Sequence, residues 1–365
     1  MSSNKIKSKF QGFNIDILSI DVGVKTQDIL LYNNSSSINF KLVLPSASLR
    51  LYQTVQKYTK EKKHLILTGE IMGGGPLKAA LYNHIKNGFK VFMTTRSAKT
   101  VKDNLDKVKN SGIYIVTEEE ARKYINDKSF AHITTSDIDV DLLKYFLEKN
   151  GFIFEPKSIA VAVQDHGYSG PDEKDNITRF KLFRDFIPGV VSDFGFASPP
   201  DIYSRMCGIK RLLKKHFPDA QHLIMDSKIA GIFGALYGTK LHDALIIEIG
   251  NAHTTAAIIK NEKIIALFEH HTGMLTTASS KLKYYIDKFT AGKLTNQEII
   301  DDGGHGCYIP DSGEFNINNN LLILATGPNR SLIEESGLCF KYAMPYNDIM
   351  IAGNIGLIEC CKRMH

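Results

Sequence analysis

The sequence contains no tryptophan and only five cysteines in 365 residues. The cysteine count is odd, and the cysteines are widely spaced apart from the adjacent pair Cys360 and Cys361, so a disulfide framework is not expected. No C-x-x-C pair occurs, and no three cysteines have the close spacing of an iron–sulfur cluster. We therefore interpret the cysteines as buried structural thiols.

Long apolar runs and a strong charge of one sign are also missing. No run approaches the roughly 18–20 apolar residues needed to cross a bilayer, and residues 1–14 are rich in Ser and Lys without an apolar signal core. The net charge of +6 is modest and its lysines are scattered, which favours solvated helix faces over a nucleic-acid surface. These absences predict a cytoplasmic protein without a membrane or nucleic-acid partner.

The first motif is a hairpin in residues 15–32, in which two apolar runs flank a polar turn. Backbone amides and a lysine in such a turn can hold a phosphate, while an aspartate holds its magnesium ion. The alternative is an ordinary hairpin with a polar tip. The residues that we expect to take part are Asp21, Gly23, Lys25 and Thr26.

A second hairpin in residues 244–260 repeats this pattern, and a third strand follows each of the two hairpins. Two copies of one β-β-β unit, in residues 15–44 and 244–268, imply two related domains. The residues of the second hairpin that we expect at a phosphate site are Glu248, Gly250, Asn251 and Thr254.

Between the hairpins, strands and helices alternate, which predicts an α/β fold with an insertion at residues 60–150. The glycine-rich loop 69–76 is a candidate anion site at a helix N-terminus, or else a tight strand–helix contact. Strand 158–164 places Asp165 at its carboxyl end, where α/β folds position catalytic groups. Asp165 is therefore a candidate catalytic residue, with capping of the next loop as the alternative.

Five segments occur in the order that is typical of the actin-like ATPase superfamily of sugar kinases, heat-shock chaperones and actin. They resemble its first phosphate loop, first connecting helix, second phosphate loop, adenosine segment and second connecting helix. Those segments are 21–26, 226–237, 248–255, 322–332 and 350–361. The resemblance implies two ribonuclease-H-like domains with a central cleft: residues 1–240 with the insertion, residues 241–346, and a connecting helix in 347–365.

The resemblance also implies a function. An ATP-binding phosphotransferase or ATPase would hold ATP and Mg²⁺ in the cleft and act on an unknown small-molecule or protein substrate. Asp21 would hold magnesium through water, Asp165 would act as base or orient water, and Gly327, Pro328 and Asn329 would surround the adenosine. Glu248 replaces the usual aspartate of the second loop, so a non-catalytic nucleotide-binding assembly factor stays as an alternative.

More narrowly, the sequence is similar to an uncharacterised prokaryotic family labelled pyruvate formate-lyase activating enzyme-like. The similar stretches are Val22-Gly23, residues 26–30, 164–167 and 268–273. Radical activation of that kind needs three closely spaced cysteines, which the sequence lacks.

Histidines gather near glycines in the turns that follow predicted strands. Together with Asp21, Asp165, Glu269 or Asp302, converging imidazoles would form a transition-metal site and suit a metal-dependent phosphohydrolase. No zinc-ligand spacing indicates one particular metal, and structural histidines are the alternative. The five histidines are His166, His253, His270, His271 and His305.

Overall fold

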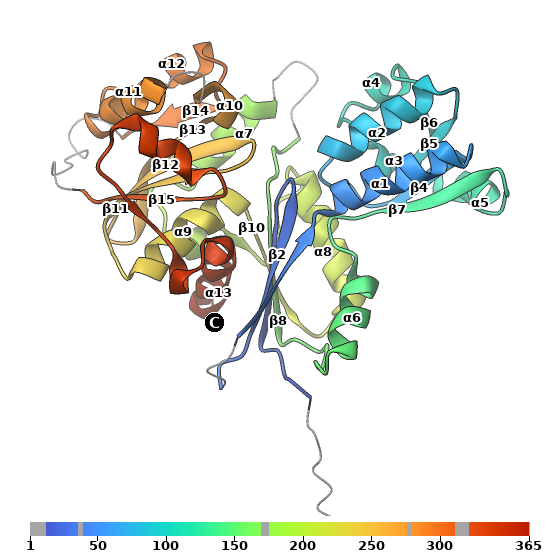
Figure 1. Ribbon diagram of the computed structural model, residues 1–365, viewed down its shortest axis with the longest axis horizontal. Coiled ribbons are helices and arrows are strands. Elements are labelled where there is room, and N and C mark those ends of the chain that lie inside the picture. Colours follow the sequence, from blue (N-terminus) through green and yellow to red (C-terminus); the bar gives the residue numbers. More distant parts are fainter. Residues whose placement is uncertain (1–11, 36–38, 169–174, 276–278, 311–320, 365) are drawn as a thin grey trace, which may run out of the picture.

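The computed structural model of the 365-residue chain describes residues 12–35, 39–168, 175–275, 279–310 and 321–364 (Figure 1). Most of the Ser- and Lys-rich residues 1–14 lie outside the described residues. Within the described residues the fold is mixed α/β and contains three sheets. The α/β class that the sequence predicts is therefore confirmed.

The first sheet has the strand order β3-β2-β1-β8-β10-β9. Its central strand β1 pairs antiparallel with β2 and parallel with β8, so the carboxyl ends of β1 and β8 lie at the same edge. The strands are β1 (Ile17–Val22), β2 (Thr26–Tyr32), β3 (Phe40–Pro45), β8 (Ser158–Val163), β9 (Gly195–Phe196) and β10 (Gln221–Met225).

The second sheet has the order β14-β13-β12-β11-β15-β16. Its central strand β11 also pairs antiparallel with the next strand and parallel with a later one. The repeated strand order that the sequence predicts is thus present in both sheets. The strands are β11 (Ala244–Ile249), β12 (His253–Lys260), β13 (Lys263–His271), β14 (Gly306–Tyr308), β15 (Ile323–Thr326) and β16 (Lys341–Tyr342).

A third, parallel sheet is built from a single stretch of chain and has the order β6-β5-β4-β7. It forms a separate lobe together with its helices (Figure 1). Its strands are β4 (His64–Gly69), β5 (Val91–Thr94), β6 (Ile113–Val116) and β7 (Phe130–Thr135). The helices of this lobe are α1 (Ala47–Lys60), α2 (Gly75–Lys86), α3 (Thr95–Ala98), α4 (Leu105–Lys109) and α5 (Glu118–Ile125). Helix α6 (Val140–Lys149) lies outside the lobe, and its buried side chains share a core with β1 and β8 of the first sheet (Figure 1).

Two helices lie side by side beside the first two sheets: α9 (Ser227–Thr239) and α13 (Ala352–Met364) (Figure 1). Glycines let their backbones touch. A Cβ at Gly234 would lie 1.7 Å from the carbonyl oxygen of Ala352, and one at Gly356 would lie 2.0 Å from that of Ala230. The glycines therefore allow the two helix backbones to pack in direct contact.

Ser46 caps helix α1, because the Ser46 hydroxyl accepts from the amide of Leu49, whereas the hydroxyl of buried Ser48 accepts from Leu77. One predicted helix boundary was wrong. Helix α13 begins five residues after its expected start, because short 3-10 turns occupy the preceding residues. The remaining helices are α7 (Asp175–Arg184), α8 (Ser204–His216), α10 (Thr272–Leu275), α11 (Ser279–Thr290), α12 (Asn296–Asp301), η1 (Val191–Phe194), η2 (Arg330–Ser336), η3 (Pro345–Asn347) and η4 (Ile349–Ile351).

A search of the described helices finds none with the length and apolar character that a bilayer crossing requires.

Candidate functional site

One cavity of about 470 Å³ is lined by residues from the first two sheets, from loops beside the third sheet, and from helices α9 and α13. The turns of both hairpins contribute to its wall, as does the turn that follows β15. Sequence-predicted residues in the lining are Asp21, Gly23, Thr26, Asp165, His166, Glu248, Gly250, Asn251, His253, Gly327 and Pro328. Segments far apart in the sequence therefore share one hollow.

The two hairpin turns have the same backbone geometry. The amide of Gly23 donates to the carbonyl of Thr26 at 2.9 Å, and the amide of Gly250 donates to the carbonyl of His253 at 3.0 Å. In both turns the glycine follows an acidic residue by two positions. A Cβ at Gly250 would lie 1.9 Å from Nζ of Lys228, so a side chain there would displace the lysine.

The carboxylate of Asp21, in the first hairpin, is closely packed and lies near a second carboxylate. The Ser227 hydroxyl donates to Oδ1 of Asp21 at 2.7 Å. Burial, with the negative charge of Asp28 nearby, raises the pKa of Asp21 to about 7, while the Ser227 hydrogen bond opposes the rise. Burial also raises the pKa of Asp28 to about 6. A Cβ at Gly353 would lie 2.1 Å from Oδ2 of Asp21, so α13 packs directly against this carboxylate.

The carboxylate of the second hairpin has a cation of its own. Lys228 forms a buried ion pair with Oε2 of Glu248. Burial raises the pKa of Glu248, and the lysine opposes that rise. Ser227 and Lys228 are adjacent at the start of α9, so this helix terminus contacts both carboxylates.

Asp165 is engaged by backbone amides. Its Oδ1 accepts from Gly167 and its Oδ2 accepts from Arg205 and Met206, each at 2.9 Å. Burial raises the pKa of Asp165, and these hydrogen bonds oppose the rise. Because both oxygens are occupied at the start of α8, the geometry favours the capping role over that of a base.

Three of the residues predicted to hold the nucleotide lie outside the cavity lining. Lys25 is exposed, and Thr254 is buried with its hydroxyl 3.0 Å from that of Thr272. The Asn329 side chain donates to the carbonyl of Gly250 at 2.9 Å, so it braces the second turn.

The glycine-rich loop packs tightly. The amide of Gly73 donates to Asp137 at 3.0 Å, and a Cβ at Gly74 would lie 2.1 Å from the carbonyl oxygen of Thr100. Those contacts favour the strand–helix packing interpretation, although the loop also lines the cavity.

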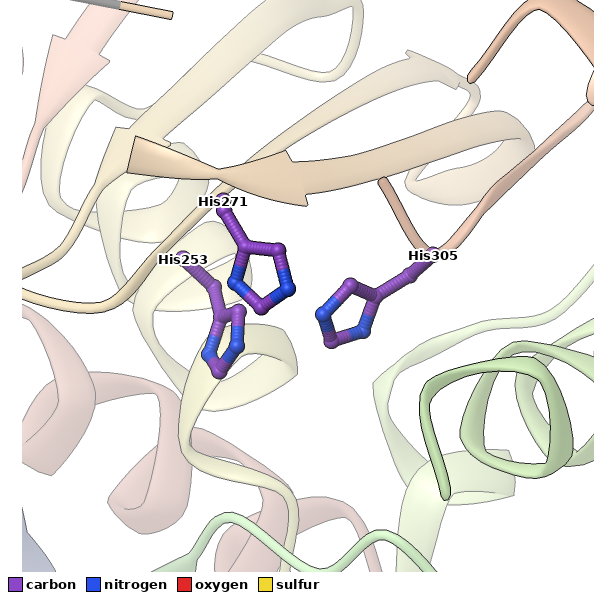
Figure 2. Close-up of side chains that lie close together, drawn as sticks. All are labelled: His253, His271 and His305. Carbon is purple, nitrogen blue, oxygen red and sulfur yellow. The ribbon is translucent and has the colours of Figure 1, made fainter. Parts of the chain in front are cut away.

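The structure gathers three of the five predicted histidines. Candidate ligand atoms of His253, His271 and His305 all lie within 4.8 Å of one another, and the rings face a common centre (Figure 2). The ring of His166 lies 6.0 Å from that of His253, between centroids. Contrary to the prediction, His270 is not in this group, because its Nε2 lies 2.9 Å from Asp302 instead. Asp21 and Asp165 are not in it either.

A fully buried arginine that the sequence analysis missed links the two main sheets. Arg179 donates to Asp226 at 2.6 Å and to Glu269 at 2.8 Å, and Nδ1 of His305 lies 2.7 Å from the same glutamate. Burial alone would raise the pKa of Glu269, but Arg179 and His305 hold it well below its usual range. A lone arginine in a helix carries no motif, so only the structure could reveal this network.

A protein-family model matches the chain. The family described as "Putative pyruvate format-lyase activating enzyme (DUF1786)" matches residues 72–332, which is more than half of the chain. The chain belongs to this family. The narrower resemblance predicted from the sequence is thereby confirmed.

Among solved structures, the ethanolamine utilization protein EutJ from Carboxydothermus hydrogenoformans aligns over 94% of this chain and 89% of its own, at 10% identity and a TM-score of 0.35. A nucleotide-free structure of acetone carboxylase aligns over 69% of this chain and 45% of its own, at 10% identity and a TM-score of 0.24. Scores this low do not by themselves establish a shared fold. No curated protein matches the chain.

The description of this DUF1786 family suggests an iron–sulfur cluster, which the cysteines do not fit. Across the described part of the chain, no three of them come together. Burial also raises the pKa of Cys307, Cys360 and Cys361, so these thiols stay protonated.

Proposed function

We propose that this protein binds a magnesium–nucleotide complex, with ATP as the first candidate, in the cavity between the two hairpin turns. The observation that carries the proposal is that two turns with one backbone geometry, more than 200 residues apart, line the same hollow. Such turns present backbone amides to an anion. A cavity of about 470 Å³ is within the range of small-molecule sites.

Magnesium fits the donor set on the wall of this cavity. Asp21, Asp28 and Glu248 are hard oxygen donors, and Mg²⁺ is commonly held by one or two carboxylates, several waters and the phosphates of a substrate. Oδ1 of Asp28 is buried and makes no hydrogen bond to the described residues. A divalent cation would offset the burial and the negative charge of Asp28 that raise the pKa of Asp21.

The arrangement of the chain in the proposal is that of the actin-like ATPases. Residues 1–240 form the first ribonuclease-H-like domain, with an α/β insertion at 60–150, and residues 241–346 form the second. The terminal helix in 347–365 returns to the first domain. The matching strand orders of the first two sheets support this division, as does the single stretch of chain that builds the third sheet.

Within this proposal the bound nucleotide is turned over, by phosphoryl transfer to an unknown acceptor or by hydrolysis. Such transfer needs mainly positioning and compensation of charge. Lys228 and the proposed magnesium ion would supply positive charge near the phosphates. In the non-catalytic alternative, tight binding would occur without product.

Calorimetry with magnesium–ATP tests the binding. Wild type should bind, and Asp21→Asn should weaken affinity at least tenfold because it removes the cation-holding carboxylate. Asp106→Asn is the control, because Asp106 is an exposed residue whose ion pair is with Lys109. No binding by wild type, or equal affinity after Asp21→Asn, would reject the proposal. Phosphate release by the same samples separates turnover from binding alone.

A metal-dependent phosphohydrolase is the second candidate, favoured by the three histidines beside the cavity. In that case, phosphate release should require a transition metal as well as magnesium, and His305→Ala should abolish it. Turnover that persists in this variant would remove the second candidate.

A further inference from the structure

The three histidines come from neighbouring points of the second sheet. His253 begins β12 and is the cross-strand partner of His271, the last residue of β13. His305 directly precedes β14, and its amide donates to the carbonyl of Glu269 at 2.9 Å. Sheet pairing therefore fixes the three backbones relative to one another, as a pre-organised site requires.

The spacing of the rings suits a single ion. Centroids are 4.5 Å apart for His253 and His305, 4.8 Å for His271 and His305, and 4.9 Å for His253 and His271. A tetrahedral ion with metal–nitrogen bonds of about 2.0–2.1 Å places its nitrogens ~3.3 Å apart. Ligand atoms that already lie within 4.8 Å can reach this spacing by small side-chain rotations.

Solvent has little access to the histidines. His253 and His305 are buried and His271 is half-buried, so their ring nitrogens have few water partners. A neutral imidazole offers a lone pair to a metal, whereas a protonated one does not. A bound ion would supply the polar partner that a buried ring nitrogen needs.

Polar side chains outside the cluster lie beside two of the rings and can orient them. Nδ1 of His305 lies 2.7 Å from the Glu269 carboxylate, which also accepts from Arg179. A small rotation of the His305 ring would let this carboxylate accept the Nδ1 proton. The opposite nitrogen, Nε2 of His305, is buried without a hydrogen-bond partner among the described residues, and the ring points at the other two histidines (Figure 2). Nδ1 of His253 lies 2.6 Å from the side-chain amide of Gln164. Carboxylate and amide partners of this kind fix the tautomer of metal-binding histidines.

We propose that His253, His271 and His305 bind one divalent transition-metal ion of the zinc, iron(II) or cobalt group. Imidazole ligands suit these metals better than they suit magnesium. His253 also lines the large cavity, so an ion held by these histidines would lie beside it. Three protein ligands with one open position are typical of catalytic rather than structural sites. The open position would take water or an oxygen atom of a bound substrate.

Metal analysis of untagged protein, purified without chelator from medium supplemented with zinc, iron and cobalt, tests the site. Wild type should carry about one transition-metal ion per chain. His305→Ala should carry less than about a tenth of that amount. His270→Asn is the matched control, because His270 adjoins the cluster in sequence but contacts Asp302, and it should keep the metal.

Cobalt titration of chelator-treated wild type gives a spectroscopic readout on folded protein. Visible ligand-field bands that saturate near one equivalent, and that His305→Ala lacks while its circular dichroism is unchanged, would support the site. A wild type without bound metal and without such bands would overturn it, as would bands that survive His305→Ala. Should His305→Ala fail to fold, His271→Asn takes its place. Magnesium–ATP calorimetry on His305→Ala keeps this result separate from the proposed nucleotide site.

Discussion

The two hairpin turns have the same backbone hydrogen bond but differ in the group that contacts their acidic residue. Asp21, in the first, receives a hydroxyl from Ser227 and lies near a second carboxylate. Glu248, in the second, is paired with the Lys228 ammonium. The acidic residue of the second turn is therefore paired with a protein cation, whereas that of the first turn is paired with a neutral hydroxyl group. In the proposed function, the ligand and its magnesium ion complete the first turn.

The largest effect on stability should come from a substitution that forces helices α9 and α13 apart. Gly234→Val would place side-chain atoms where the Ala352 carbonyl now lies, so we expect it to destabilise the protein by about 3 kcal/mol or more. Urea unfolding measures the loss. Gly75→Ala, where an added Cβ meets nothing within 4 Å, is the control. A stable Gly234→Val variant would mean that this contact does not hold the sheets together.

Removing Lys228, the cation that pairs with Glu248 of the second turn, should have the next largest effect on stability. Lys228→Met leaves the buried Glu248 unpaired, which costs about 3 kcal/mol at neutral pH. Adding Glu248→Gln in the same chain should restore most of the stability, and chemical unfolding of the three variants gives the coupling energy. If the double variant is no more stable than Lys228→Met, the pair is not the source of the loss.

At the first turn, removing a charged side chain should stabilise the protein instead of destabilising it. The pKa of Asp21 is raised to about 7, so the native state binds more protons than the unfolded state between about pH 4 and 7, and stability falls as the pH rises through that range. Asp21→Asn removes this penalty and should stabilise the ligand-free protein at pH 8 by about 1–2 kcal/mol, with a smaller gain at pH 5.

Unfolding at the two pH values measures this difference, with Asp106→Asn as the control. A loss of stability at pH 8, or an equal gain at both values, would contradict the account of the first turn.

The smallest effect concerns Asp165. As a cap, Asp165→Asn should cost about 1 kcal/mol, because the amide can still accept from some of the three backbone N–H groups. Any phosphate release should survive this change within a few-fold. A loss of turnover by 100-fold or more with unchanged stability would instead restore the catalytic role.

The sequence sufficed for the parts of the fold and site that rest on local pattern. Alternating apolar residues and the Gly23 and Gly250 turns predicted both hairpins. Pairings between distant residues have no local signal, which is why the Arg179 network and the Lys228–Glu248 pair were not foreseen. The exclusion of His270 has a different cause: adjacent strand residues point to opposite faces, so it could not join His271.

Hydrogen exchange with and without magnesium–ATP is the most direct test of the central claim, that both turns bind one ligand. The account predicts that peptides covering residues 22–26 and 250–254 become protected together, at the same nucleotide concentration, and that Asp21→Asn reduces the protection of both. Protection of one turn alone, or of neither at saturating magnesium–ATP, would contradict it.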